Sequence, residues 1–288
     1  MLYKIILAGG GGTRLIPLST EENPKQFISL IGEDSLLQTT FKRMKGHSEN
    51  TDNIFISSSS KYKEKILQQL PINKNQLILE SERKNTAPAI ALIVKALEEN
   101  WAKEDDLILI SPADHIITPQ ETFEQYIHQG EEYTKQGNIV LFGIQPTYPE
   151  IGYGYIKVKE NDTISDIDSF KEKPDQTTAE KYINEGNYLW NSWMFLFSVK
   201  TIQEAFKKHC PDIYKYMTWN LEHFIQNFQN LKPISIDYAI MEKADNIKIC
   251  SMKNLERIDI GDWERLKGFY KKYPNTISST AKLYLEQE

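Results

Sequence analysis

The sequence is poor in cysteine and has no long apolar run, and both absences restrict what the chain can be. Its two cysteines, Cys210 and Cys250, lie far apart and lack metal-ligand spacing. This excludes a disulfide framework and fits a reducing cytoplasm. The apolar start, residues 5–8, is too short for a signal peptide, and no later run could span a membrane. We therefore expect a cytoplasmic protein.

Positive charge is also in deficit, since the net charge is −6. This balance argues against a nucleic-acid partner or an anionic membrane. If the ligand is anionic, its cationic contacts must be concentrated in one place. A length of 288 residues with 40% hydrophobic and 26% charged residues is ordinary for a globular protein of one large or two modest domains.

The first half alternates between two kinds of pattern. Helical patterns at about 36–44, 61–70, 87–100 and 122–135 lie between apolar, β-branched runs, which predict buried strands at residues 5–7, 54–56, 77–79, 107–110 and 139–142. Such alternation predicts a parallel sheet covered by helices on both faces. Ligands of these sheets bind beyond the carboxyl ends of the strands. We therefore expect residues 9–14 and Asp114 at the same rim.

The second half, from about Gly152, has a different pattern of apolar and polar residues. Residues 155–159 alternate apolar and polar, as a half-exposed strand does, and residues 195–197 and 247–250 suggest further strands. Residues 212–228 carry one apolar stripe and predict a single helix, while Ser235-Ile236-Asp237 predicts a capped helix start. A short helical tail follows Trp263. We predict two halves, residues 1–150 and 151–288, packed as one unit.

The most informative segment is a glycine run between a predicted strand and two cations. Gly9-Gly10-Gly11-Gly12 is followed by Thr13, Arg14 and, further on, Pro24-Lys25-Gln26-Phe27. No Lys-Ser or Lys-Thr pair follows, so this is not a P-loop, and Arg14 stands where a dinucleotide fingerprint needs its third glycine. Backbone N–H groups in such a turn form an anion-binding concavity. With two added cations, the segment predicts a cradle for a polyphosphate.

Further segments make the pattern more specific. They are Asn85-Thr86-Ala87-Pro88, Pro112-Ala113-Asp114-His115, Gly152-Tyr153-Gly154-Tyr155, Phe170-Lys171-Glu172-Lys173-Pro174, Asn187-Tyr188-Leu189-Trp190-Asn191-Ser192, Ser235-Ile236-Asp237-Tyr238 and Asp259-Ile260-Gly261. In this order, and together with the glycine run, they resemble the sugar-1-phosphate nucleotidyltransferases. Among these, the chain looks most like the mannose-1-phosphate guanylyltransferases, or GDP-mannose pyrophosphorylases.

The resemblance implies both a fold and a reaction. The fold is an α/β, Rossmann-like, mostly parallel sheet flanked by helices, with a nucleotide-binding first half and a smaller, mixed sugar-binding second half. In the implied reaction, GMP passes from GTP to α-D-mannose 1-phosphate. The products are pyrophosphate and GDP-mannose, an activated sugar for cell-surface polysaccharide synthesis. The resemblance also implies Mg²⁺ as cofactor and a homodimer.

The resemblance carries over to particular residues. Arg14 and Lys25 would be catalytic: Arg14 can fork the oxygens of the leaving phosphates, and Lys25 can bridge the α-phosphate and the incoming phosphate. Asp114 and Asp259 would bind the metal, because Mg²⁺ prefers carboxylates with phosphate oxygens and water. The nucleotide would contact Leu7, Ala8, Gly9, Gly10, Gly11, Gly12, Thr13, Glu80, Lys84, Asn85, Thr86 and Ala87.

The sugar phosphate would contact Gly154, Glu172, Lys173 and Asn191. A carboxylate can accept two hydroxyl hydrogen bonds from a hexose, and the adjacent lysine can neutralise its phosphate. Trp193 stands where relatives usually carry glycine. Two residues apart on a strand, Asn191 and Trp193 should share a face. We therefore expect Trp193 to flank the sugar pocket, the alternative being a core tryptophan.

Other interpretations stay open for the chain. The same reaction could act on another sugar 1-phosphate or another nucleotide. A sensor without catalysis could keep the fold and regulate a partner, although Arg14, Lys25, Asp114 and Asp259 retain the charges that such a protein should lose. Several of these residues could equally have structural roles, with Asn85 or Thr86 as a helix cap and either aspartate as a turn cap.

Overall fold

The structure is a computed structural model that describes residues 1–12, 15–171 and 173–285, and of Asp259 the backbone alone. Two compact units are formed from separate stretches of the chain. The large unit contains Met1–Lys4, Glu80–Ser111 and Glu121–Leu255, and the small unit contains Ile5–Leu79, Pro112–Gln120 and Glu256–Glu288. Neither unit has a boundary near residue 150, because each is assembled from several separate segments. The assignment of separate functions to residues 1–150 and 151–288 therefore stays a prediction.

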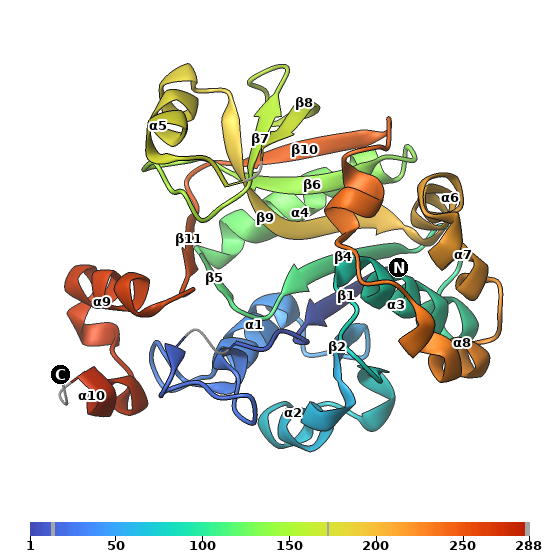
Figure 1. The fold of residues 1–288 in the computed structure, drawn as a ribbon, viewed down its shortest axis with the longest axis horizontal. Coiled ribbons are helices and arrows are strands. Elements are labelled where there is room, and N and C mark those ends of the chain that lie inside the picture. The colour runs from blue at the N-terminus through green and yellow to red at the C-terminus, as the bar shows by residue number, and fades with distance from the viewer. Residues whose placement is uncertain (13–14, 172, 286–288) are drawn as a thin grey trace. The chain divides into compact units, whose positions relative to one another are not determined.

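The small unit begins with strands that adjoin in the order β3-β2-β1: β1 (Leu2–Leu7), β2 (Ile54–Ser59) and β3 (Leu77–Glu80). Between them lie α1 (Leu36–Lys45) and α2 (Lys63–Gln69) (Figure 1). Helix α1 begins at a capping box, in which Ser35 and Gln38 each accept a backbone N–H of the other. The apolar, β-branched strand residues thus become buried strands, as their composition predicts.

A two-stranded antiparallel ribbon completes the small unit. Strand β5 (His115–Thr118) pairs with β11 (Glu256–Asp259), and β11 leads into α9 (Trp263–Lys272) and then α10 (Ser279–Leu285) (Figure 1). Helix α9 begins where Asp262 accepts the N–H of Arg265. Both helices pack onto one apolar cluster, which includes Leu15, Leu30, Ile260, Leu266 and Tyr270. The predicted helical tail is therefore confirmed, and it covers the segment after the glycine run.

The large unit contains six adjoining strands in the order β4-β9-β6-β10-β8-β7. They are β4 (Leu107–Pro112), β6 (Ile139–Ile144), β7 (Tyr155–Val158), β8 (Ile164–Lys171), β9 (Tyr188–Ser198) and β10 (Ile247–Met252). Strand β10 runs parallel to β6, whereas β9 runs antiparallel to both β4 and β6. The α/β class is confirmed, and the sheet is mixed because β9 returns between two strands of the first half.

Helices of the large unit flank this sheet. They are α3 (Thr86–Asn100), α4 (Gln120–Thr134), α5 (Gln176–Glu185), α6 (Val199–His209), α7 (Pro211–Met217) and α8 (Leu221–Asn227). Figure 1 shows α6, α7 and α8 beside α3, and α3 contacts each of them. Helix α3 is buried over most of its length, from Ala87 to Leu97, which explains its nearly uniform apolar sequence. In the ranges the structure covers, no helix has the length and apolar character to cross a membrane.

Two expectations about the second half need correction. Residues 212–228 do not form a single helix, because the chain breaks after α7 and Asn220 caps a new helix by accepting the N–H of His223 at 2.8 Å. The apolar stripe continues across the break, since Ile213, Met217, Phe224 and Phe228 are all buried. The segment after Ser235 is a π-helix, η6 (Asp237–Met241), rather than an α-helix. Such π turns occur often at functional sites.

Candidate active site

The glycine run is held from beneath by one buried side chain. The Gln26 amide nitrogen donates to the carbonyl oxygens of Ala8 at 3.0 Å and Gly10 at 2.8 Å. Ser58 Oγ also donates to Ala8 O, at 2.9 Å. In a trans peptide, a carbonyl and the following N–H point in opposite directions. The N–H groups of Gly9 and Gly11 therefore point away from Gln26, as an anion-binding turn requires.

Gly12 lies directly against the backbone of Lys25. Its φ angle is +55°, in the region that favours glycine. A Cβ atom at this position would meet the Lys25 backbone nitrogen at 2.5 Å, closer than side chains approach backbone. Glycine is thus required here both for its backbone conformation and for the close approach to Lys25. This close packing sets the position of the Lys25 backbone. Thr13 and Arg14 lie outside the described residues, so their predicted roles stay predictions.

Lys25 lies in an ion pair with Asp114. Its Nζ is 2.9 Å from Asp114 Oδ2 and donates to the carbonyl of Ile260 at 3.2 Å. The Lys25 side chain is 12% exposed and the Asp114 side chain 29%. The backbone N–H of Ala113 donates to Leu7 O at 3.0 Å, so the end of β1 and the turn before Asp114 adjoin. Two segments far apart in sequence thus meet at one rim, as the strand-end rule predicts.

The second predicted metal ligand comes from the neighbouring strand. In the β5–β11 ribbon, the Cα of Asp259 is the register partner of His115, the residue after Asp114. Ile260, the residue after Asp259, supplies the carbonyl that Lys25 contacts. The backbone therefore brings Asp259 next to Lys25 and Asp114 within the small unit. Its predicted role as a ligand rests on this placement.

Asp114 is held in its charged form. Burial would raise the pKa of Asp114, but Lys25, His115 and Arg257 together hold that pKa well below its ordinary value. A carboxylate that stays ionised suits a hard cation such as Mg²⁺. Among the side chains that the structure describes, no group of three His, Cys, Asp or Glu could hold a metal ion. An ion here would therefore take part of its coordination from phosphate oxygens and water, as Mg²⁺ commonly does.

Arg43 is a supporting residue that the sequence analysis did not single out. It lies on α1, is 5% exposed, and donates from Nη1 to the carbonyl of His115 at 2.6 Å. Burial lowers the pKa of Arg43 to about 10, and the charge of Asp114 opposes that shift, so the guanidinium stays protonated. Its sequence signal was a charged residue on the apolar stripe of a predicted helix, which indicates a buried and paired cation.

The residues predicted to contact the base belong to the large unit. Asn85 has a φ of +69° and caps α3 by accepting the N–H of Thr86 at 2.8 Å. Thr86 Oγ1 accepts the N–H of Ile236 at 2.8 Å, and Lys84 Nζ lies 3.1 Å from a Glu82 oxygen. Glu80 is buried at the end of β3. Asn85 therefore has the structural role of a cap, and base recognition by Glu80, Lys84, Asn85, Thr86 and Ala87 stays a prediction.

Two of the predicted sugar residues are joined in the large unit. The N–H of Asn191 donates to the carbonyl of Gly154 at 2.9 Å. The Asn191 side chain accepts the N–H of Trp193 at 2.9 Å and donates to Asp237 Oδ1 at 3.1 Å. Lys173 is exposed, and Glu172 lies outside the described residues. The structure thus brings Gly154 and Asn191 together, and it adds Asp237 as a partner, a residue of a family motif to which the sequence assigned no contact with the sugar site.

Trp193 lies in a β-bulge, which overturns the alternation argument made for it. Leu141 of β6 pairs with Phe195, but Gly143 pairs with Asn191, so β9 has two extra residues at this step. Trp193 takes a φ of +59°, which is uncommon for a bulky residue. Ser192 Oγ donates to the carbonyl of Phe142, the β6 residue that the bulge leaves without its ladder partner. Strand periodicity therefore does not place Trp193 on the face of Asn191, and its half-buried side chain is not part of the core.

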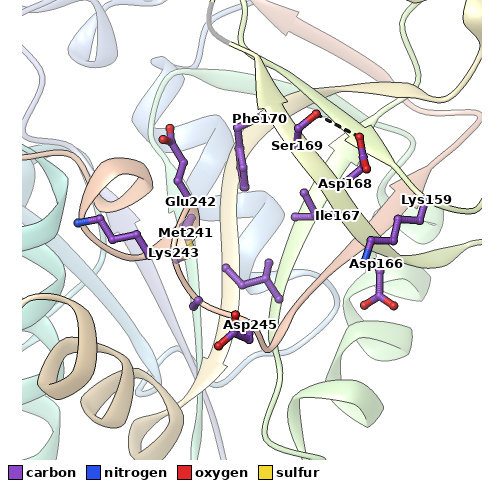
Figure 2. A pocket seen from close by; sticks show the side chains of 12 residues that line it. Lys159, Asp166, Ile167, Asp168, Ser169, Phe170, Met241, Glu242, Lys243 and Asp245 are labelled. Carbon is purple, nitrogen blue, oxygen red and sulfur yellow. Dashed lines mark hydrogen bonds between the residues drawn. The ribbon is translucent and has the colours of Figure 1, made fainter.

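A separate cavity of about 480 Å³ lies in the large unit, lined by β8 and by the segment that follows η6 (Figure 2). Its charged lining residues carry both signs: Lys159, Asp166, Asp168, Glu242, Lys243 and Asp245. None of the predicted site residues that the structure describes lines this cavity. It therefore does not belong to the predicted sites.

The motifs and the fold agree with a single protein family. A family model described as nucleotidyl transferase matches residues 3–267. The chain belongs to the nucleotidyl transferase family. The glycine loop, the Lys25–Asp114 pair and the mixed sheet all lie within that matched range.

Individual relatives within this family have more specific names. A mannose-1-phosphate guanylyltransferase of Escherichia coli is 37% identical over 94% of this chain and 62% of its own length. The mannose-1-phosphate guanylyltransferase RfbM of Salmonella typhimurium is 38% identical over 91% of this chain and 57% of its own length. A solved structure from Thermus thermophilus, described as a mannose-1-phosphate geranyltransferase, has a TM-score of 0.82 and 29% identity, covering 92% of this chain and 79% of that one. The chain thus spans about three fifths of the length of these two curated relatives.

Proposed function

We propose that this chain transfers GMP from GTP to mannose 1-phosphate, with pyrophosphate as the second product. The contact of Lys25 with Asp114, beside the glycine loop and the backbone of Asp259, carries the proposal. It places a cation, an ionised carboxylate and outward N–H groups together in the small unit. The two curated relatives, which carry this activity in their names, support the choice of substrates.

In the proposed reaction, a phosphate oxygen of mannose 1-phosphate attacks the α-phosphorus of GTP. The bond from this phosphorus to the oxygen bridging it to the β-phosphate breaks, and pyrophosphate leaves with that electron pair. Such transfers depend mainly on positioning and charge neutralisation. The N–H groups of the glycine loop and Arg14 would bind the leaving phosphates, and Lys25 would stabilise charge on the transferring group. Asp114 and Asp259 would hold Mg²⁺, which, when bound, offsets the negative charge of both reactants.

The sugar end of the reaction is assigned to the large unit. Glu172 would accept hydrogen bonds from hexose hydroxyls, and Lys173 would neutralise the sugar phosphate. Asn191 would act in an orientation fixed by Trp193 and Asp237. Base recognition would come from residues 80–87. Supply of GDP-mannose for cell-surface polysaccharides is the corresponding biological role.

The product itself tests the reaction type. With GTP, mannose 1-phosphate and Mg²⁺, we expect ³¹P NMR to show pyrophosphate and GDP-mannose appearing together, with the α-phosphorus of GTP retained in the sugar nucleotide. Transfer of the γ-phosphate would instead give GDP and no pyrophosphate. Release of inorganic phosphate alone would be hydrolysis. Either result would contradict the proposed reaction.

Metal dependence tests the two aspartates. We expect activity to disappear in excess chelator and to return with Mg²⁺. Replacing Asp259 with asparagine should raise the Mg²⁺ concentration for half-maximal rate at least roughly tenfold, since even residues behind metal ligands change affinity roughly 10- to 100-fold. The comparison is a Mg²⁺ titration of the two proteins at saturating substrates. An unchanged midpoint would give Asp259 a structural role.

Trp193 tests the sugar assignment through the variant Trp193→Gly. Glycine keeps the N–H that Asn191 accepts and tolerates the φ of +59°, so the change removes little besides the indole. If the indole shapes the sugar pocket, the ratio of kcat/KM between mannose 1-phosphate and glucose 1-phosphate should change roughly 10- to 200-fold. The KM for GTP should stay nearly constant. An unchanged ratio together with a lower melting temperature would show that Trp193 only supports the fold.

A further inference from the structure

The segment before α3 has a strained backbone that the proposed reaction does not explain. Asn85 has a φ of +69° and a ψ of −175°, a combination that is essentially confined to glycine. Such a conformation persists only where surrounding contacts hold it, and it occurs most often at active sites and ligand clamps. Asn85 lies among the residues predicted to contact the base. The contacts that hold this turn therefore bear on function.

Backbone hydrogen bonds from a distant segment hold the turn on both sides. The N–H of Ile234 donates to the carbonyl oxygen of Lys84 at 3.3 Å, and the N–H of Ala87 donates to the carbonyl oxygen of Ile234 at 3.1 Å. A single residue, Ile234, thus engages the chain both before and after Asn85. The second bond also satisfies an N–H in the first turn of α3, where the helix itself offers no acceptor.

Thr86 adds a side-chain contact to the same segment. Its Oγ1 accepts the N–H of Ile236 at 2.8 Å. Ile236 is fully buried, and a buried N–H that loses its acceptor keeps the cost of its desolvation. We call these three hydrogen bonds, which join residues 84–87 to residues 234–236, the α3 clasp. The Thr86 hydroxyl is the one side-chain group among the three, so a substitution can remove it and leave the backbone bonds in place.

The α3 clasp ends one residue before a contact with the predicted sugar site. Asp237, the first residue of η6, accepts a hydrogen bond from the Asn191 side chain at 3.1 Å. Asn191 and Asp237 make other interactions as well, so this hydrogen bond does not act alone. All of these residues belong to the large unit. The clasp therefore joins the predicted base-contact segment to the segment that contacts Asn191.

We propose that Thr86 is a positioning residue: by accepting the Ile236 N–H, it holds residues 234–237, and through them the Asn191 side chain, in place for the sugar phosphate. The segment predicted to recognise the base thus also orders the sugar site. The effect on the sugar rests on the proposed function, whereas the effect of Thr86 on Asn191 does not. A Thr86 that only contacts the base would change nucleotide affinity alone.

The first experiment uses NMR of the protein without substrates. Thr86→Val removes the acceptor with little change of shape, and Thr86→Ser keeps it. The Ile236 N–H should exchange with solvent roughly fivefold to a hundredfold faster in Thr86→Val, because a buried donor loses its partner. The side-chain amide signals of Asn191, assigned by their loss in Asn191→Ala, should shift in Thr86→Val and stay near wild type in Thr86→Ser. Unchanged Asn191 signals in Thr86→Val would overturn the proposal.

Thr218→Val is the matched control for this substitution. Thr218 is an exposed residue of the same unit, and its Oγ1 donates to the carbonyl of Lys215 at 2.8 Å, a bond outside the clasp. An equal shift of the Asn191 signals in this control would show general destabilisation and contradict the assignment to Thr86. Melting curves confirm that each variant is folded. If Thr86→Val fails to fold, Thr86→Ala, which also lacks the acceptor, replaces it with the same expected results.

The second experiment measures the effect on the sugar phosphate by steady-state kinetics. At saturating GTP and Mg²⁺, Thr86→Val should raise the KM for mannose 1-phosphate roughly twofold to tenfold, as expected for one typical hydrogen bond, with kcat near wild type. Thr86→Ser should restore the KM. In an Asn191→Ala background, Thr86→Val should raise the KM no further, because residues that act through one another are not additive. Equal factors in both backgrounds, or a change confined to the KM for GTP, would overturn the link to the sugar site.

The outcomes separate this inference from the proposed function. A wild type that prefers another nucleotide or sugar phosphate would change the proposed function, and the same comparison with that pair would test Thr86. A wild type without transferase activity would contradict the proposed function alone, because Ile236 exchange and the Asn191 signals decide the inference without substrates. Shifted Asn191 signals with an unchanged KM for the sugar phosphate would overturn the positioning role.

Discussion

Lys25→Ala should lower turnover by roughly two to four orders of magnitude, with the protein still folded. Loss of a single group that stabilises transition-state charge typically costs roughly 10²–10³ in kcat, and Lys25 brings a full charge. The lysine is held by Asp114 Oδ2 at 2.9 Å and by the carbonyl of Ile260 at 3.2 Å. Its ammonium group is therefore already positioned before substrates arrive. Steady-state kinetics at saturating GTP and sugar phosphate measure the effect.

The stability cost of this variant should be limited. Breaking a fully buried ion pair costs roughly 3–5 kcal/mol, but the Asp114 side chain is 29% exposed and has Arg257 nearby. We expect a loss below that range in denaturant unfolding. Lys61→Ala is the control, since Lys61 pairs with Glu21 at 2.7 Å on the exposed surface of the same unit. Turnover of Lys25→Ala within a few-fold of wild type would remove Lys25 from the mechanism.

Gly12→Ala should cause the second large loss, although it removes no functional group. The added methyl would meet the Lys25 backbone nitrogen at 2.5 Å, and alanine is strained at a φ of +55°. The loop must shift, and Lys25 must shift with it. A displacement of about 1 Å in a catalytic group can cost roughly 100-fold in rate. Left-handed backbone in a residue other than glycine adds about 1–2 kcal/mol of instability.

A glycine elsewhere in the small unit supplies the comparison. Gly268 lies in α9, and a Cβ atom there would meet nothing within 4 Å. Gly268→Ala should therefore keep wild-type turnover and be as stable as wild type or slightly more stable, because alanine favours a helix over glycine. If Gly12→Ala matches Gly268→Ala in turnover, the glycine loop does not position Lys25.

The parts of the fold that the sequence predicts are those set by local pattern. Strands β1, β2, β4 and β6 follow from runs of buried, β-branched residues, and α3 follows from a long apolar segment after Asn85. The glycine loop and Asp114 lie at the same edge of the sheet because each follows the carboxyl end of a strand, and the order of strands in the sequence is enough to predict this. For these elements the local sequence pattern is sufficient, because buried strands and helices require apolar residues at the positions they bury.

Other features depend on contacts that no local pattern contains. Contact between Arg257 and His115 joins residues 142 positions apart, and it arises only because β11 pairs with β5. The bulge at Trp193 exists because β9 pairs with β6 on both sides of a register shift, so the residues between the two paired stretches are left over. A period of two therefore cannot place the Trp193 side chain relative to Asn191. Asn220 interrupted a predicted helix because its side chain caps a new one, although the apolar stripe continued.

The role of each site residue is predictable from sequence only where a motif fixes it. Lys25 and Asp114 were selected as separate charges, and the structure pairs them. Gln26 was only part of a motif, yet its amide holds two carbonyls of the glycine loop. Arg43 gave a weak signal because a single charged residue on an apolar stripe is easily taken for a surface residue. Partners of this kind become visible only when the backbone brings distant segments together.

The most direct test of the central claim is pyrophosphate release measured across a panel of substrates. GTP, ATP, UTP and dTTP are each combined with mannose 1-phosphate, glucose 1-phosphate and galactose 1-phosphate in the presence of Mg²⁺. We predict that GTP with mannose 1-phosphate gives the highest kcat/KM. A higher value for another pair would keep the reaction and change its substrates. No pyrophosphate from any pair, although GTP binds, would contradict the proposed transferase and favour a nucleotide-sugar sensor.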